Sequence, residues 1–440
     1  MAESSAAAPE PGRPGSRVLL GLLALVAAVG VGVSLAAWAF LELIHQMQVF
    51  VFTDLPEDLG YHDGAPSWWY LVVLALAGLL VALAITRLPG HGGHVAAEGL
   101  KVGGAPTEPI ELPGVILASL ATIGLGLVLG PEAPLIALGA GLGLLAIRSV
   151  RRDAPDQLQA VIAASGSFAA MAMIFSSPII AAVILIEAMG LDREKLPKVL
   201  VPGLLAAGVG SLISIGMGSL TGLSTSDYSL APLPVAELAE PTVAEFAWTI
   251  PLAVAVAALG FVILRGGLRV HRTVMTRPWL LITAAGALVA CLAIAFREIS
   301  GKGIEQVLFS GQDALPGLIG EAGSWSVGAL LLLLGFKGLA WSVSLGSFRG
   351  GPTFPALFIG AAAGILASHL PGFAETGAIG VGMGAGIVSV LRLPLAAVVL
   401  STLLVSQGGA GAGPLIIVGV VVAYLTTMAL DRAFVESGSA

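Results

Sequence analysis

Apolar segments separated by short polar loops run through almost the whole chain. They lie at about 18–52, 68–87, 111–129, 132–147, 158–175, 178–190, 199–219, 246–264, 279–296, 325–345, 354–370, 377–391, 394–406 and 414–430. The first segment is much longer than the roughly 20 residues that span a bilayer, so we expect one strongly tilted helix there. Several later segments hold only about 13 to 16 residues and are divided by Gly or Pro, which is typical of broken or re-entrant helices. The pattern predicts an all-α polytopic membrane protein.

The amino-acid composition supports this class. Hydrophobic residues make up 57% of the 440 positions and charged residues only 11%, which excludes an ordinary soluble domain. The lipid bilayer is therefore the expected environment, and we expect no nucleic-acid partner. Cys291 is the only cysteine, so neither a disulfide nor a cysteine metal site is possible within one chain. We expect no cofactor.

Basic residues are concentrated in a few loops, which predicts the orientation of the chain. These residues are Arg13, Arg17, Arg148, Arg151, Arg152, Arg193, Lys195, Lys198, Arg265, Arg269, Arg272 and Arg277. Because cytoplasmic loops carry the excess of Lys and Arg, we expect these loops and both termini to be cytoplasmic, in a plasma (inner) membrane. The acidic stretches at 54–63 and 227–245 are then external.

The same pattern divides the chain into two membrane halves. We expect a disordered cytoplasmic tail at 1–16, a first half at 17–220, an external linker at 221–245, a second half at 246–431 and a tail at 432–440. No regulatory domain is expected after the second half.

A short motif occurs once in each half. The sequence GPEAPL at 130–135 returns as GPTFPA at 351–356, and the Gly and Ala residues that follow keep the same offset of 221 residues (351 minus 130). Each Gly-Pro pair interrupts a hydrophobic segment and opens a helix whose first amides have no partner within the helix. Interruptions at corresponding places in two halves indicate a transporter binding site, where two helix N-termini attract an anion.

Glu132 is the charged residue of the first motif. A carboxylate inside hydrophobic sequence is costly in a membrane, so we treat Glu132 as a candidate functional residue. The alternative is a helix N-terminal carboxylate that only satisfies the helix dipole.

Three segments, in order, resemble the CLC family of chloride channels and proton-coupled chloride exchangers. The strongest match is 337–361, which contains Lys337, SLGS, GG and LFIGA and is similar to the family's glycine-rich segment ending in GxFxP. GPEAP at 130–134 resembles the GKEGP or GREGP motif. The third match consists of Phe175, Pro178 and Glu187. The resemblance extends from about 20 to 430 and identifies the chain as a divergent member.

The resemblance implies an inverted repeat of two halves that transports chloride or a similar small anion, channel-like or in exchange for protons. It also implies a homodimer with its interface on 178–190, 199–219 and 394–430. Glu132 is implied to be a gate that blocks the anion path when ionised and leaves it when protonated. The residues implied to bind the anion are His91, Gly92, Gly93, Pro131, Ala133, Thr353 and Phe354. Those implied to support the pore are Gly130, Gly350, Gly351, Pro355 and Lys337, and no metal ion is implied.

The chain departs from the family pattern at several of these positions. Pro131 replaces the basic residue before the gating glutamate, and Pro352 removes one backbone donor from the second motif. His91 takes the place of the anion-coordinating serine, and a neutral imidazole N–H can donate to an anion. The family's late anion-binding tyrosine has no clear match; Phe434 is near that position. For Lys337 the alternative is a snorkelling or carbonyl-capping lysine.

The proton pathway is the departure that affects the mechanism most directly. Exchangers of the family carry an internal proton-transfer glutamate, but the matching position here is Ala188, and Glu187 directly precedes it. Channel-like transport and proton coupling therefore both stay open, with Glu187 as the candidate relay.

Two other functions are compatible with the sequence. One is a channel or exchanger for another anion, such as fluoride or nitrate. The other is a metal-dependent membrane enzyme that uses His91, His94 and Glu98, whose i, i+3, i+7 spacing fits one helical face. Gly92 and Gly93 weaken a helix there, and no HExxH pair is present.

Overall fold

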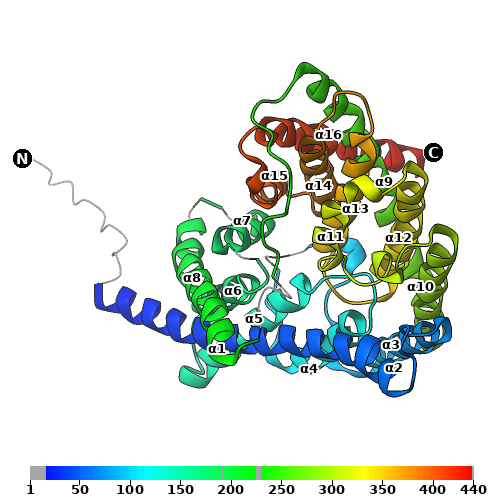
Figure 1. The fold of residues 1–440 in the computed structure, drawn as a ribbon. Helices are drawn as coiled ribbons and strands as arrows, with labels where there is room; N and C mark the ends of the chain where they lie inside the picture. The colour runs from blue at the N-terminus through cyan, green and yellow to red at the C-terminus, as the bar shows by residue number, and fades with distance from the viewer. Residues whose placement is uncertain are drawn as a thin grey trace, which may run out of the picture.

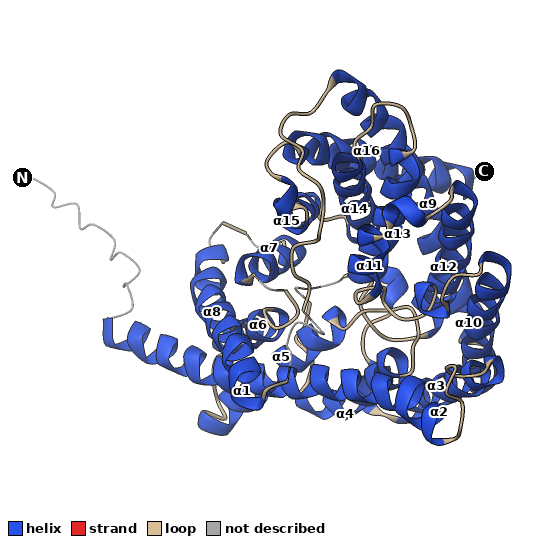
Figure 2. Ribbon diagram, viewed as in Figure 1, coloured by secondary structure: helices blue, strands red, loops and turns tan. Residues whose placement is uncertain are grey.

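Helices make up the regular structure of the protein. The computed structural model describes residues 16–100, 102, 104–175, 177–190, 192–193, 195–223 and 229–438. Within these residues no β-strand is formed, and Figure 2 shows helices joined by loops throughout. The predicted all-helical architecture is confirmed.

In the described part of the chain, eight helices are long and apolar enough to cross a membrane, and five more are apolar but shorter. The first half contains α1 Ser16–Val49, α2 Leu55–Asp58, α3 Ser67–Arg87, α4 Leu112–Ser119, α5 Glu132–Val150, α6 Asp156–Met171, α7 Pro178–Met189 and α8 Leu196–Thr221. The second half contains α9 Val243–Val274, α10 Pro278–Ser300, α11 Ala314–Gly320, α12 Val327–Ser347, α13 Thr353–Ser368, α14 Glu375–Leu391, α15 Pro394–Leu404 and α16 Ala412–Gly438. Of the shorter apolar helices, α7 and α15 begin at a Pro and α13 begins directly after one, as the broken-helix pattern predicts.

The first apolar segment forms one long helix. A single turn of π-helix at Phe50–Asp54 joins α1 to α2, so the helical run extends over Leu19–Asp58, which is 40 residues. At about 1.5 Å per residue, this helix is much longer than the hydrocarbon core of a bilayer is thick. The length fits the tilted helix that the sequence predicts.

The two halves repeat the same packing. In the first half α5 packs on α6, and α6 packs on α8 and α1. In the second half α13 packs on α14, and α14 packs on α16 and α9. Figure 1 shows α5–α8 in one lobe, cyan to green, and α12–α16 in the other, yellow to red. Contacts of α3 with α10 join the halves on one side.

Glycines allow the helices that carry the repeated motif to lie very close to their partners. A Cβ atom at Gly143 of α5 would lie 2.7 Å from the carbonyl oxygen of Ile162 in α6. A Cβ atom at Gly364, the equivalent residue of α13, would meet the carbonyl oxygen of Ala378 in α14. Small residues at helix contacts let membrane helices approach closely, which fixes the positions of the α5 and α13 N-termini.

The structure adds detail at the two predicted boundaries. Between α8 and α9, residues 229–242 contain no helix, and Leu233 and Leu238 donate backbone hydrogen bonds to Leu404 and Gly408. At the other end, α16 continues to Gly438, beyond the predicted end of the second half at 431. Within this helix, Asp431 is paired with Arg265 and Arg392. Residues 1–15, 224–228 and 439–440 of the predicted tails and linker lie outside the described residues.

Candidate anion pathway

The two copies of the repeated motif touch each other in the middle of the protein. The backbone N–H of Gly130 donates to the carbonyl of Gly351 at 2.7 Å, and Gly351 donates back to Gly130 at 2.6 Å. Because these glycines are equivalent positions of the repeat, their reciprocal pairing places a pseudo-twofold axis between them. Helices α5 and α13 each begin two residues later. Two helix N-termini therefore meet here, as the repeat predicts.

Glu132 lies in this contact and is fully buried. Its Oε1 accepts a hydrogen bond of 3.0 Å from the backbone N–H of Phe354, in the first turn of α13. Among the described residues, its Oε2 has no hydrogen-bond partner. A Cβ atom on Gly130 or Gly351 would meet the carboxylate, so both glycines are needed for its position. A carboxylate from one repeat thus occupies the helix N-terminus of the other.

The ring of Phe354 lies against that of Phe175, so the segment that contains Phe175, Pro178 and Glu187 also reaches this site. The two ring centroids lie 5.9 Å apart, and both rings are buried. Thr353, which occupies the position equivalent to Glu132, is also buried. Pro131 and Pro352 precede α5 and α13 at the N-cap positions. The structure therefore assembles Pro131, Thr353 and Phe354 around the Glu132 carboxylate.

A cavity of about 100 Å³ lies next to the first turn of α5. Gly92, Gly93 and His94 line one part of it, and Ala133 lines another. Gly92 and Gly93 have φ values of +75° and +95°, so a side chain at either position would be strained as well as crowded. The cavity brings together three residues that were predicted to bind the anion.

Arg349 is a cavity-lining residue that the sequence analysis missed. Its side chain is only 4% exposed. Its Nε donates to the carbonyl of His91 at 3.3 Å, and its Nη1 donates to the carbonyl of Phe348 at 3.2 Å. The sequence could have identified Arg349 as a candidate, because no other Asp, Glu, Lys or Arg lies between Lys337 and Glu375.

The His91 side chain is placed differently from the expectation. His91 lies in a short turn at Pro89–Gly92, where its φ is +50°. Its exposed imidazole contacts the carbonyl of Ile85 through Nδ1 at 3.0 Å, and the residue does not line the cavity. The contribution of His91 is its backbone carbonyl, which holds the Arg349 guanidinium.

His91, His94 and Glu98 do not share a helical face. His91 and Glu98 belong to two separate turns, Pro89–Gly92 and Ala96–Glu98, because the glycines between them interrupt the helix. His94 contacts the carbonyl of Gly99 through Nε2 at 2.6 Å. No metal-binding group of three or more His, Cys, Asp or Glu side chains occurs among the described residues. The helical-face arrangement suggested by the spacing is therefore wrong.

One ion pair holds the loop before α4 against α5. The Arg148 guanidinium donates to both carboxylate oxygens of Glu108, at 2.5 and 3.0 Å. These hydrogen bonds keep the pKa of Glu108 below its ordinary value. Thr107, the residue before Glu108, lines the cavity, so this pair fixes one wall.

Lys337 has a structural role that the sequence analysis considered as an alternative. The side chain is fully buried, and its ammonium lies 4.3 Å from the centre of the Phe358 ring. Its three N–H donors are shared among the carbonyls of Gln306, Val307, Leu308 and Phe309, whose oxygens lie 2.9, 3.3, 3.2 and 3.5 Å from Nζ. Lys337 thus fixes the loop between α10 and α11 against α12 and α13.

We expect Lys337→Met to lower the free energy of unfolding by about 3 kcal/mol or more, because it leaves several buried carbonyls without a donor. Thermal unfolding of the detergent-purified protein measures this. Lys302→Met is the control, since Lys302 also lies over an aromatic ring, that of Trp325, at 4.5 Å. Equal melting temperatures for the two variants would contradict the capping role.

Glu187 is bound at the start of another helix. Its carboxylate accepts hydrogen bonds from the backbone N–H groups of Leu395 at 2.9 Å and Ala396 at 2.7 Å. Both donors belong to the first turn of α15, whose amides have no acceptor within the helix. Glu187 therefore links α7 to the N-terminus of α15.

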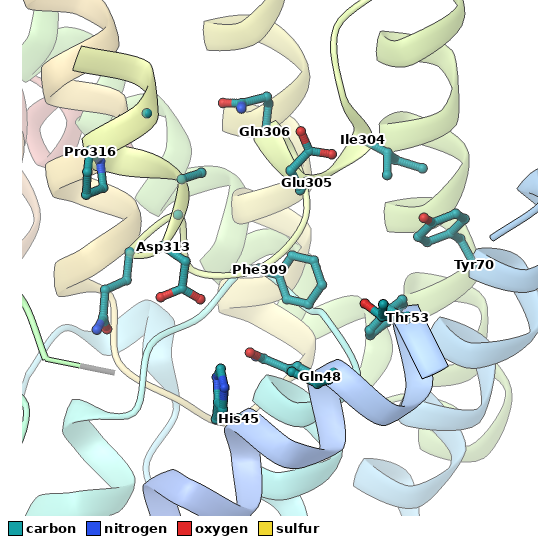
Figure 3. A pocket seen from close by; sticks show the side chains of 16 residues that line it. His45, Gln48, Thr53, Tyr70, Ile304, Glu305, Gln306, Phe309, Asp313 and Pro316 are labelled. Carbon is teal, nitrogen blue, oxygen red and sulfur yellow. The ribbon is translucent and has the colours of Figure 1, made fainter. Parts of the chain in front are cut away.

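A second, larger cavity of about 760 Å³ opens between the end of α1, the start of α3 and the loop before α11. Figure 3 shows His45 and Gln48 of α1 on one side of the cavity, across from Asp313 and Phe309 of that loop. Phe309 lines this cavity, and its backbone N–H donates to the carbonyl of Gly126 at 2.9 Å. Gly126 lies in the segment that leads to Gly130, so the cavity adjoins the approach to the central contact.

Comparison with known proteins places the chain in a family. The family described as voltage gated chloride channel matches residues 74–428. The Putative ion-transport protein YfeO of Escherichia fergusonii is 30% identical over 369 residues, which cover 81% of this chain and 82% of that protein. The protein of the same name from Escherichia coli K12 (DH10B) is 31% identical over the same shares.

Solved structures show the same fold. A slow cyanobacterial Cl⁻/H⁺ antiporter has a TM-score of 0.71 at 19% identity, covering 93% of this chain and 94% of that one. A CLC-type fluoride/proton antiporter has a TM-score of 0.68 at 17% identity, covering 94% of this chain and 96% of that one. The chain therefore belongs to the CLC family, as the motifs indicated. It is a multi-pass membrane protein of CLC-type anion transport and not an enzyme, which removes the metal-dependent enzyme from consideration.

Proposed function

We propose that this protein moves chloride or a similar small anion across the membrane, with Glu132 as the gate. The anion is dehydrated between the backbone turns at 90–94, 131–134 and 352–355, where amide donors replace water. The observation that supports the gate is the fully buried Glu132 carboxylate, which accepts the Phe354 amide hydrogen at the N-terminus of α13. The carboxylate occupies a donor that an anion would otherwise use.

The proposed gating step follows from charge. The ionised carboxylate is attracted by the N-terminal dipoles of α5 and α13 and by the Phe354 amide. Protonation removes the negative charge, so the side chain is held less strongly and leaves the α13 N-terminus. An anion then takes its place, and flux rises as the pH falls.

Chloride efflux from proteoliposomes tests this proposal, with the external pH recorded at the same time. We expect wild-type flux to rise at acidic pH. We expect Glu132→Gln, which keeps the shape and removes the charge, to have higher flux at pH 7 and a weak response to pH. Equal flux and an equal pH response in both proteins would overturn the gate.

We propose that Glu187 acts as a cap of α15 rather than as a proton relay, because both carboxylate oxygens already accept backbone N–H groups. Replacement of Glu187 by Ala should lower the free energy of unfolding by about 1–3 kcal/mol, since two amides lose their acceptor. The ratio of protons to anions moved should stay at the wild-type value. Loss of proton movement with anion flux preserved would instead identify Glu187 as the relay.

We also propose a homodimer in a plasma (inner) membrane with both termini cytoplasmic. Large apolar side chains are exposed on the helices that the family resemblance assigns to the interface. They include Ile179 of α7, Leu212 and Ile215 of α8, Leu395 of α15, and Ile417 and Leu425 of α16. Crosslinking and mass measurement in mild detergent test the dimer, and a protein that is only monomeric would contradict it.

A further inference from the structure

Arg349 is a buried cation that forms no close ion pair, and the Glu98 carboxylate acts on it only through its charge. None of the ion pairs formed by the described residues includes it. A buried charge is expensive, and direct contact with an anion compensates it more fully than a carboxylate that makes no hydrogen bond to it. The residue lines the 100 Å³ cavity next to the first turn of α5. An anion in that cavity is the partner that the site can accept.

The guanidinium has donors left for such an anion. Arginine has five N–H donors, and the two side-chain hydrogen bonds of Arg349 use Nε and one N–H of Nη1. Among the described residues, Nη2 donates no hydrogen bond, so three donors remain. One N–H of Nη1 and both N–H groups of Nη2 are therefore available to an anion.

The size of the cavity limits the ligand. At about 30 Å³ per water molecule, 100 Å³ corresponds to about three waters. A halide with water, or one triatomic or tetraatomic anion, is of this size. The other parts of the lining that bear on binding are Gly92, Gly93 and Ala133, whose small size leaves the space open, and His94.

We propose that Arg349 binds the transported anion in this cavity and that its fork adapts the site to small planar oxyanions such as nitrate. A planar oxyanion presents two oxygens to two parallel N–H donors, whereas a spherical halide presents one centre. The fixed charge attracts either anion, and the fork adds preference for the planar one. This inference rests on the proposed anion pathway.

The experiment is calorimetric titration of sodium nitrate and sodium chloride into the detergent-purified protein. We expect the wild type to bind nitrate more tightly than chloride. Arg349→Gln should weaken nitrate binding by about 10- to 100-fold, the usual effect of losing charge-assisted hydrogen bonds, and chloride binding by less. Arg349→Lys keeps the charge without the fork, so it should keep most of the chloride affinity and lose the preference for nitrate.

Two controls separate binding from folding. Arg297→Gln removes an arginine that bonds to Ser67 and Glu298, away from the cavity, and should bind both anions as the wild type does. If Arg349→Gln cannot be purified, the ratio of nitrate affinity to chloride affinity measured for Arg349→Lys tests the proposal instead. An unchanged ratio in Arg349→Lys, or a wild type that prefers chloride, would overturn the inference.

The gating role of Glu132 and the anion preference of Arg349 can be disproved independently of each other. Calorimetry reports binding even if liposomes show no flux or no response to pH. The ratio of nitrate affinity to chloride affinity should change in Arg349→Lys, whereas the pH response of the flux should change in Glu132→Gln. A ratio that depended on Glu132 and not on Arg349 would contradict the assignment of the preference to Arg349.

Discussion

Gly351→Ala should raise anion flux at pH 7 roughly tenfold or more and make it nearly independent of pH. The new Cβ atom would meet Oε2 of Glu132 and would lie 2.6 Å from its Cδ, so the carboxylate cannot keep its buried position. The side chain then loses its charge-assisted hydrogen bond to Phe354, which is worth about 1.5–3 kcal/mol, the equivalent of at least a tenfold change. Chloride efflux from proteoliposomes at pH 7 and pH 5 measures the effect.

The adjacent glycine provides a matched control for this variant. A Cβ atom at Gly350 would crowd Leu129 and the carbonyl of Gly130 without meeting Glu132. Gly350→Ala should therefore perturb the same loop and retain a flux that rises as the pH falls. If Gly350→Ala and Gly351→Ala had the same pH response, displacement of Glu132 would not be the cause.

The steric conflict also predicts coupling between Gly351 and Glu132. In a Gly351→Ala, Glu132→Ala double variant, the carboxylate that the new methyl group would strike is absent. The double variant should thus be more stable than the sum of the single variants predicts, by about 1–3 kcal/mol. Additive losses of unfolding free energy would show that the two residues do not share this space.

Gly360→Leu is expected to have the largest effect on folding. A Cβ atom at Gly360 of α13 would already meet the carbonyl of Gly382 in α14 and lie 2.8 Å from the Cα of Met383. A leucine would force the helices apart and displace the α13 N-terminus. We expect a loss of more than about 4 kcal/mol of unfolding free energy and little folded protein in detergent. Size-exclusion chromatography and thermal unfolding measure this loss.

The chain offers a control with the same chemical change. Gly335 of α12 is exposed, and a Cβ atom there meets nothing within 4 Å. Gly335→Leu should therefore fold as the wild type does, because leucine has the higher helix propensity. By the repeat, Gly139→Leu in α5 should resemble Gly360→Leu, since a Cβ atom at Gly139 would meet the carbonyl of Gly166 in α6. Folded Gly360→Leu would show that α13 can move without unfolding the protein.

Much of the fold was available from the sequence because its causes are local. The length and apolarity of each segment predict helices, and Gly-Pro pairs predict where they break. The offset of 221 residues identified the motifs at Gly130 and Gly351, which meet through reciprocal hydrogen bonds in the structure. The burial of Glu132 follows from its hydrophobic neighbours in the sequence.

The details of the candidate site were harder to predict because they depend on side-chain direction and on contacts across the repeat. Motif matching assigned an anion-binding side chain to His91, but its ring contacts Ile85 and its carbonyl holds Arg349. The distance in sequence between His91 and Arg349 hides their contact. Glu187 likewise meets the α15 N-terminus only through the packing of α7 on α15.

The sequence by itself determined the membrane class, the two repeats, the close-packing glycines and the buried carboxylate, because hydrophobicity, helix breaking and small size are properties of single residues and short segments. Only the tertiary structure decided what each polar group contacts. It placed Glu132 on the amide of Phe354, Lys337 on the carbonyls before α11, and Arg349 at the cavity. The physical reason is that a buried polar group is satisfied by whichever partner the packing of distant helices brings to it.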